Sequence, residues 1–133
     1  MYLDILTDEE KRLFLDLAWM AVECDGEVAD KEREVVASYQ GECQLNDYVR
    51  SGKTQEEILG VLAMSERSHK KIILLELMGI WGADGEWRDP EITMMDRVAN
   101  ALGIPDSRVN RLRRWSREFR QILVDGYQLV MET

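Results

Sequence analysis

The chain of 133 residues is poor in the residue types that build most metal and redox centres. It contains one histidine and two cysteines, Cys24 and Cys43, and no C-x-x-C pair. A structural zinc site needs several cysteine or histidine ligands close together, so none is expected here. The low cysteine count agrees with a reducing cytosol.

Long hydrophobic runs and signal segments are also missing. The longest apolar stretch, residues 72–81, is interrupted by Glu76 and Gly79, whereas a membrane-spanning helix needs about 20 apolar residues. The acidic segment 1–10 lacks the basic region and apolar core of a signal peptide. We therefore expect a soluble cytoplasmic protein without a membrane partner.

Basic residues are in the minority. The chain has 17 Lys and Arg against 26 Asp and Glu, so its net charge is −9. This field repels nucleic acid and attracts cations and basic partners. We expect a protein partner and consider a divalent cation, whereas nucleic acid is disfavoured.

The residue pattern predicts an all-α fold. No window alternates between apolar and polar residues over a useful length, so strands are not expected. Capping-box patterns at Thr7–Glu10 and Thr54–Glu57, together with glycine and proline breaks, indicate a single domain, residues 1–133, that forms a compact bundle of about 6–7 helices. The expected helices begin near residues 7, 30, 54, 71, 89 and 106, and the last one ends near Val124, before Gly126.

An internal repeat divides this domain. Residues 25–32, Asp-Gly-Glu-Val-Ala-Asp-Lys-Glu, and residues 84–91, Asp-Gly-Glu-Trp-Arg-Asp-Pro-Glu, share five of eight positions at an offset of 59. An apolar helix precedes each copy and an amphipathic helix follows it. The repeat predicts two pseudo-repeated helix–acidic loop–helix hairpins, at about 7–45 and 66–104. They are joined by a connector over 46–65 and followed by a basic-faced helix at about 106–124.

The repeated loops are rich in carboxylates. The candidate metal ligands are Asp25, Glu27, Asp30 and Glu32 in the first copy and Asp84, Glu86, Asp89 and Glu91 in the second. Three interpretations stay open: a structural hairpin signature made of helix caps and glycine ends, a cation site, or a charged docking surface. A standard EF-hand is excluded, because its first ligand position falls on Ala21 and on Ile80. Oxygen ligands favour Ca²⁺, Mg²⁺ or Mn²⁺ over zinc, but no cofactor is certain.

The hairpin pattern resembles a known family. Ala-Trp-Met-Ala-Val-Glu-Cys-Asp-Gly, residues 18–26, with Glu32, and Met-Gly-Ile-Trp-Gly-Ala-Asp-Gly, residues 78–85, with Glu91, are similar to the two motifs of the tellurite-resistance TerB-like family, which includes the amino-terminal domain of DjlA-type co-chaperones. The resemblance covers roughly residues 10–105. It implies a TerB-like helical bundle, a metal-binding acidic face and a non-enzymatic, stress-related role. The Arg-rich segment after Asp106 departs from the family pattern.

This last helix has a basic face. An apolar arc includes Val109, Leu112, Trp115 and Phe119, and the arginines occupy the opposite side of the helical wheel. They are candidates for partner binding, unless they form only a solvated surface: Arg111, Arg113, Arg114, Arg117 and Arg120.

The remaining candidates are single residues. We expect Cys24 to be a buried small residue and His69 to lie at the surface, while Glu76 lies at a helix edge or is a buried acid with a partner. No phosphate loop, nucleophile elbow or HExxH motif occurs, so the protein is not expected to be an enzyme. Two hypotheses follow: a TerB-like binding module that holds divalent cations, or a metal-free, co-chaperone-like or scaffold interaction domain. Whether the chain forms a homo-oligomer is left open.

Overall fold

The computed structural model describes residues 1–24, 26, 28, 30–83, 85 and 87–133. In these ranges the chain is all-helical, with a short 3₁₀ helix, η1, at Leu3–Ile5 and no strand. The α-helices are α1, Asp8–Glu23; α2, Asp30–Glu42; α3, Gln55–Leu62; α4, Arg67–Trp81; α5, Asp89–Ala101; and α6, Asp106–Met131.

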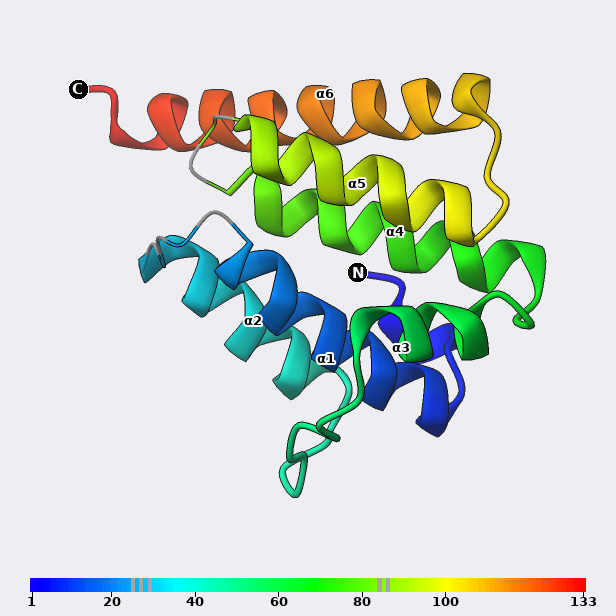
Figure 1. The fold of residues 1–133 in the computed structure, drawn as a ribbon. Helices are drawn as coiled ribbons and strands as arrows, with labels where there is room; N and C mark the ends of the chain where they lie inside the picture. The colour runs from blue at the N-terminus through cyan, green and yellow to red at the C-terminus, as the bar shows by residue number, and fades with distance from the viewer. Residues whose placement is uncertain (25, 27, 29, 84, 86) are drawn as a thin grey trace.

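Helices α1 and α4 form the centre of the bundle. They pack against each other, while α2 and α3 pack on α1 and α5 and α6 pack on α4 (Figure 1). Their apolar side chains, among them Phe14, Leu17, Leu77 and Trp81, are fully buried. Helix α4 starts at Arg67, four residues before the predicted Lys71, so His69 belongs to its first turn.

The two predicted capping boxes are confirmed. Thr7 Oγ1 accepts from the Glu10 amide at 3.2 Å, and the Glu10 carboxylate accepts from the Thr7 amide at 2.8 Å. Thr54 and Glu57 make the same pair of bonds at 3.1 Å each. Such reciprocal bonds satisfy two of the amides that a helix start leaves unpaired. The sequence therefore fixes the starts of α1 and α3.

The connector between the hairpins is anchored on a buried carboxylate. Asp16 in α1 accepts hydrogen bonds from the Tyr48 hydroxyl at 2.6 Å and from the Ser51 hydroxyl at 2.5 Å. Burial, and then the nearby Asp16 carboxylate, raise the pKa of Tyr48, so its hydroxyl stays protonated and donates. Segment 45–53 is a non-helical loop held against α1.

Helix α6 is longer than the sequence pattern predicts. It continues through Gly126 to Met131, so the expected end near Val124 was wrong. A single glycine costs a helix only about 1 kcal/mol relative to alanine and does not by itself end it. Despite this length, no helix in the described part of the chain is long and apolar enough to cross a membrane.

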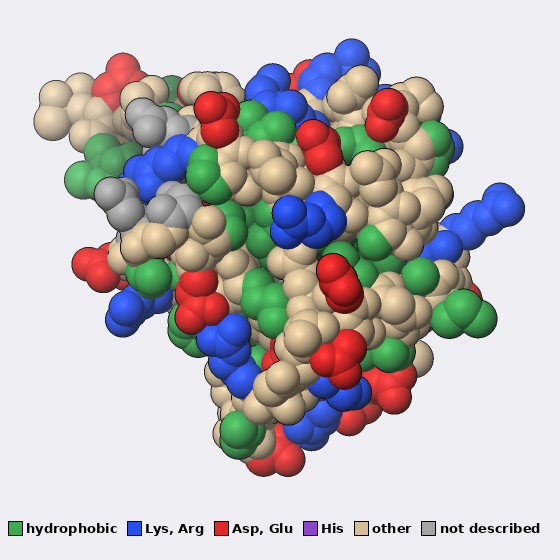
Figure 2. Space-filling model, viewed as in Figure 1, with side chains coloured by type: hydrophobic (Ala, Val, Ile, Leu, Met, Phe, Trp, Pro, Cys, Tyr) green, Lys and Arg blue, Asp and Glu red, His purple; other side chains and the backbone are tan. Residues whose placement is uncertain are grey.

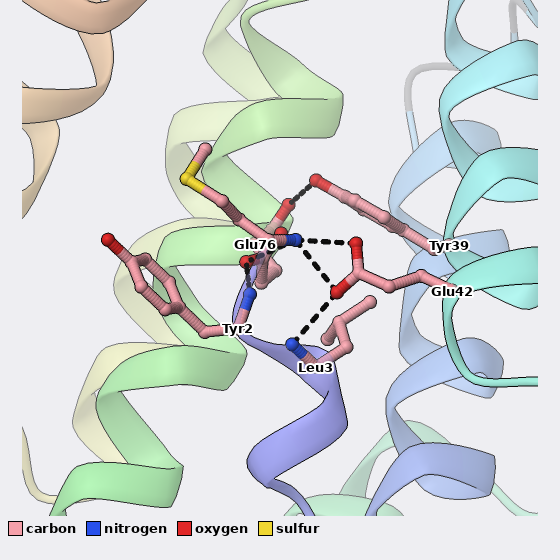
Figure 3. A network of polar contacts seen from close by, with 6 residues as sticks. Tyr2, Leu3, Tyr39, Glu42 and Glu76 are labelled. Carbon is pink, nitrogen blue, oxygen red and sulfur yellow. Dashed lines mark hydrogen bonds and ion pairs between the residues drawn. The ribbon is translucent and has the colours of Figure 1, made fainter.

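The first residues of the chain are held by two glutamates (Figure 3). The Met1 amine contacts the Glu42 carboxylate at 2.6 Å and Glu76 Oε1 at 3.2 Å. Glu76 also accepts from the Tyr2 amide at 2.9 Å, and Glu42 accepts from the Leu3 amide at 3.0 Å. Glu76 is thus a buried acid with partners, one of the two alternatives that the sequence left open. These contacts fix η1 against α2 and α4.

The α2–α4 contact has little space at Gly79. The Tyr39 hydroxyl donates to the Glu76 carbonyl oxygen at 2.7 Å, and a Cβ atom added at Gly79 would lie 2.6 Å from that hydroxyl. Burial, and then the charge of Glu76, raise the pKa of Tyr39, which keeps the hydroxyl protonated.

We predict that Gly79→Ala lowers the free energy of unfolding by about 1–3 kcal/mol, because the methyl group displaces a buried, hydrogen-bonded tyrosine. Chemical denaturation measures the change. Gly41→Ala in α2 is the matched control: its Cβ meets nothing within 4 Å, so it should stabilise the protein by about 0.5–1 kcal/mol. Equal effects of the two substitutions would contradict the predicted clash.

Candidate functional site

The candidate metal ligands occupy the two hairpin loops and the helix starts that follow them. Asp25, Glu27, Asp84 and Glu86 lie outside the described residues. Asp30 and Asp89 are exposed first residues of α2 and α5, and Glu32 and Glu91 are buried in the first turns. Over the ranges that the structure describes, no group of three or more His, Cys, Asp or Glu is arranged to hold a metal ion. A cation site at the loops stays a prediction.

Glu91 has a defined role at the start of α5. Its Oε1 accepts from the Arg88 amide at 2.8 Å, and Arg88 is the residue that precedes the helix. Asp89, where the sequence predicts that a helix begins, is the first helical residue of α5. The acids in this turn are favourable because the helix start is electropositive.

Gly26 and Gly85 have the left-handed backbone that the sequence predicted for helix ends, with φ angles of +80° and +88°. Their surroundings differ. A Cβ at Gly26 would meet nothing within 4 Å, whereas a Cβ at Gly85 would lie 3.0–3.1 Å from the Arg120 guanidinium. One arginine of α6 therefore packs against Gly85 within the same chain.

The basic face of α6 is divided between the interior and the solvent. Arg111, Arg114 and Arg117 are exposed, as expected. Arg113 is half-buried, with its guanidinium 5.1 Å from the centre of the Trp87 ring, and Arg120 packs at Gly85. Burial, and then repulsion from Arg117, lower the pKa of Arg113. Arg113 and Arg120 are therefore turned toward the bundle more than the other three, because α6 packs with its apolar arc turned partly away from the bundle.

The same rotation leaves apolar side chains exposed on α6. Trp115 stacks on Phe119 at a ring distance of 5.2 Å and is 39% exposed. Beyond Arg120, the helix runs past the end of the α4–α5 hairpin (Figure 1). We define the exposed apolar face of α6 as Trp115, Ile122, Leu123, Tyr127, Leu129, Val130 and Met131. Figure 2 shows hydrophobic side chains at the surface near the C-terminal end of this helix.

A second surface feature is an acidic groove of about 770 Å³ on another side of the bundle. It lies between the starts of α1 and α4 and the length of α3. Its lining residues are Thr7, Glu9, Glu10, Glu56, Glu57, Gly60, Val61, Leu62, Met64, Ser65, Glu66 and His69. His69 was expected at the surface, but it is largely buried there and its Nδ1 lies 2.7 Å from Glu10 Oε1.

Neither the exposed apolar face of α6 nor the acidic groove was predicted from the sequence. The apolar residues of α6 were assigned to a core-facing arc, and only the length of the apolar pattern beyond Gly126 could have indicated an unfilled face. The glutamates of the acidic groove come from α1, from α3 and from the residue before α4, and the capping-box patterns that contain Glu10 and Glu57 do not show that these segments meet. Cys24 is half-buried and lies at a different groove, with Met20, Asp89 and Arg97.

The glycine conformations generate one prediction. Gly26→Ala and Gly85→Ala should both destabilise the fold, because alanine resists a positive φ, by about 1 kcal/mol at Gly26. Gly85→Ala should cost more, since the new methyl group also displaces Arg120. Thermal and chemical denaturation measure the difference. Truncation of Arg120 to alanine should bring the cost at Gly85 close to that at Gly26, and a larger cost at Gly26 would be inconsistent with this arrangement.

The Glu10 contacts generate a second prediction. Burial acts to raise the Glu10 pKa, but hydrogen bonds involving Ser65, Thr7 and His69 together outweigh it, so the folded-state pKa lies below 4.5. The folded protein thus binds fewer protons than the unfolded chain, and this contribution is complete above pH 4.5 and lost as the pH falls through the folded pKa. We predict that the free energy of unfolding of Glu10→Gln falls less steeply at acid pH than that of the wild-type protein. Glu9→Gln removes the same charge at an exposed position and should show the same acid dependence of the free energy of unfolding as the wild-type protein.

Comparison with protein-family models, curated proteins and solved structures finds no match for this chain. The two surfaces described above therefore carry the functional argument.

Proposed function

We propose that this protein is a non-catalytic binding module that docks a protein partner through the exposed apolar face of α6. One observation carries the proposal: seven large apolar side chains of a single helix are 39–80% exposed. Large apolar side chains exposed together on one element are costly in water and typically mark an interaction site. The patch extends along residues 115–131.

The charges beside this face indicate the kind of partner. Arg111, Arg114 and Arg117 are exposed on α6, and side chains of Lys and Arg lie along the top of the view where α6 runs (Figure 2). Charge complementarity across an interface favours an acidic partner and accelerates its association. The contact should weaken as salt rises, because exposed charges are screened beyond about 8–10 Å.

The hairpin architecture supports the proposed membership of the TerB-like family. Helices α2 and α5 each have 13 residues and begin at Asp30 and Asp89, 59 residues apart, which is the offset of the sequence repeat. Two equivalent hairpins built on α1 and α4 would make a pseudo-repeated bundle of that type. The non-enzymatic, stress-related role and the cytoplasmic location implied by the resemblance belong to this proposal. No described contact favours the divalent-cation alternative.

Photo-crosslinking in the source cells tests the docking role. We predict that a benzoylphenylalanine residue at position 122 or 129, in the exposed apolar face, forms covalent adducts after irradiation. The matched control is position 128, where Gln128 is exposed on the polar side of the same helix. Mass spectrometry identifies the adduct as a second copy of this chain or as another protein.

The yield of these adducts should fall when Arg114 and Arg117 are both replaced by glutamate, since the proposed partner is acidic. Adducts confined to positions 122 and 129 and sensitive to this charge reversal would support the proposal. Equal adduct formation at position 128, or none at any position, would overturn it.

A further inference from the structure

The acidic groove carries an excess of negative charge beside an apolar floor. It is lined by Glu9, Glu10, Glu56, Glu57 and Glu66 and by no lysine or arginine among the residues described. Leu62 is buried beneath the groove, whereas Met64 and Val61 are 88% and 40% exposed. A groove with this lining fits an amphipathic helix whose flanks are basic.

The internal contacts neutralise only part of this charge. Glu10 pairs with His69 Nδ1 at 2.7 Å, and the Glu57 carboxylate accepts from the Thr54 amide at 3.1 Å. Glu66 lies 3.7 Å from His69 Nε2 and is largely exposed. Glu9 and Glu56 are also exposed. Three carboxylates on the rim therefore face solvent and can receive basic side chains.

Helix α6 has the complementary chemistry. Its exposed arginines 111, 114 and 117 lie along the same helix as Trp115 and Ile122, so basic and apolar groups are presented together. The segment from Arg108 to Arg120 contains six arginines and one glutamate, a net charge of +5 in a chain whose net charge is −9. Charges in contact attract more strongly than distant charges repel, so an arginine beside a groove glutamate favours association despite the overall negative charge of both molecules.

We infer that α6 of one molecule docks into the acidic groove of a second copy of this chain. This inference rests on the docking role proposed above and names its partner. Helices α3 and α6 lie on opposite sides of the bundle (Figure 1), so α6 cannot reach the groove of its own chain. The contact is therefore heterologous, and repetition gives a closed ring or an open chain.

Direct pairing of two α6 helices fits the charges less well. Such pairing would use the same face twice and would leave the glutamates of the acidic groove without a basic partner. In the helix–groove contact, by contrast, arginines meet glutamates, and Trp115 and Ile122 meet Met64 and Val61. The second copy is thus the occupant that this chain's own surface chemistry favours.

Two variants, each defective in one half of the contact, test the inference. The helix variant carries Arg111→Glu and Ile122→Glu, both at exposed positions. The groove variant carries Gly60→Arg, where a Cβ meets nothing within 4 Å, so the fold should tolerate the larger side chain. Circular dichroism and melting temperature establish that both variants fold. Sedimentation velocity at low and high salt measures the assembly.

Wild-type protein should associate at low salt and dissociate as salt rises, and each variant alone should associate at least about tenfold more weakly. An equimolar mixture of the two should form a 1:1 dimer and nothing larger, because only one intact helix and one intact groove remain to pair. Gln128→Glu, on the polar side of α6, should assemble like wild type.

Three results would overturn the inference: a wild-type protein that stays monomeric at low salt, a groove variant that assembles normally, or a mixture that does not dimerise. Normal assembly of the groove variant with loss in the helix variant would indicate α6–α6 pairing. A monomeric protein that still gives face-specific crosslinks to another protein would leave the proposed docking function intact and remove only the second copy.

Discussion

The packing of α1 against α4 is the contact on which the rest of the structure depends. Both helices bury large apolar side chains along most of their length, and every other α-helix packs on one of them. Burial of apolar surface stabilises the fold at roughly 25 cal/mol per Å², so this pair supplies much of the core. Two buried carboxylates of these helices have hydrogen-bond partners: Asp16 accepts from the Tyr48 hydroxyl, and Glu76 accepts from the Tyr2 amide.

In this arrangement, only part of the length of α6 packs against the bundle. Helix α6 packs mainly on α4, and α4 ends at Trp81 near Gly85, against which Arg120 packs. Beyond Arg120 the helix runs past the end of the α4–α5 hairpin (Figure 1), and Ile122, Leu123 and Tyr127 face solvent. The contacts of Arg113 with Trp87 and of Arg120 at Gly85 set the rotation of α6, because turning its apolar arc inward would remove both.

The two hairpins are alike in backbone and different in surroundings. Each has a left-handed glycine at its loop and a buried glutamate in the first turn of the following helix. Among the described residues, Arg120 of α6 packs at Gly85 in the second hairpin, whereas a Cβ at Gly26 in the first meets nothing within 4 Å. The hairpins therefore present different surfaces, and function is better sought in α6 and the acidic groove than in the repeated motif alone.

Local chemistry in the sequence was sufficient to predict the helical class, both capping boxes and the left-handed glycines, because each depends on interactions within a few residues. The predicted helix end near Val124 was wrong. The small free-energy cost of Gly126 in a helix is outweighed by the interactions of the rest of α6. The amphipathic pattern of α6 identified its apolar arc but not the rotation of the helix, which depends on what α4 and α5 place beside it. The acidic groove was invisible in the sequence, since Glu9, Glu56 and Glu66 come from separate segments that only the packing of α1, α3 and α4 brings together. Tertiary structure alone decided which apolar residues of α6 were left exposed, because burial requires a neighbouring surface as well as a hydrophobic side chain.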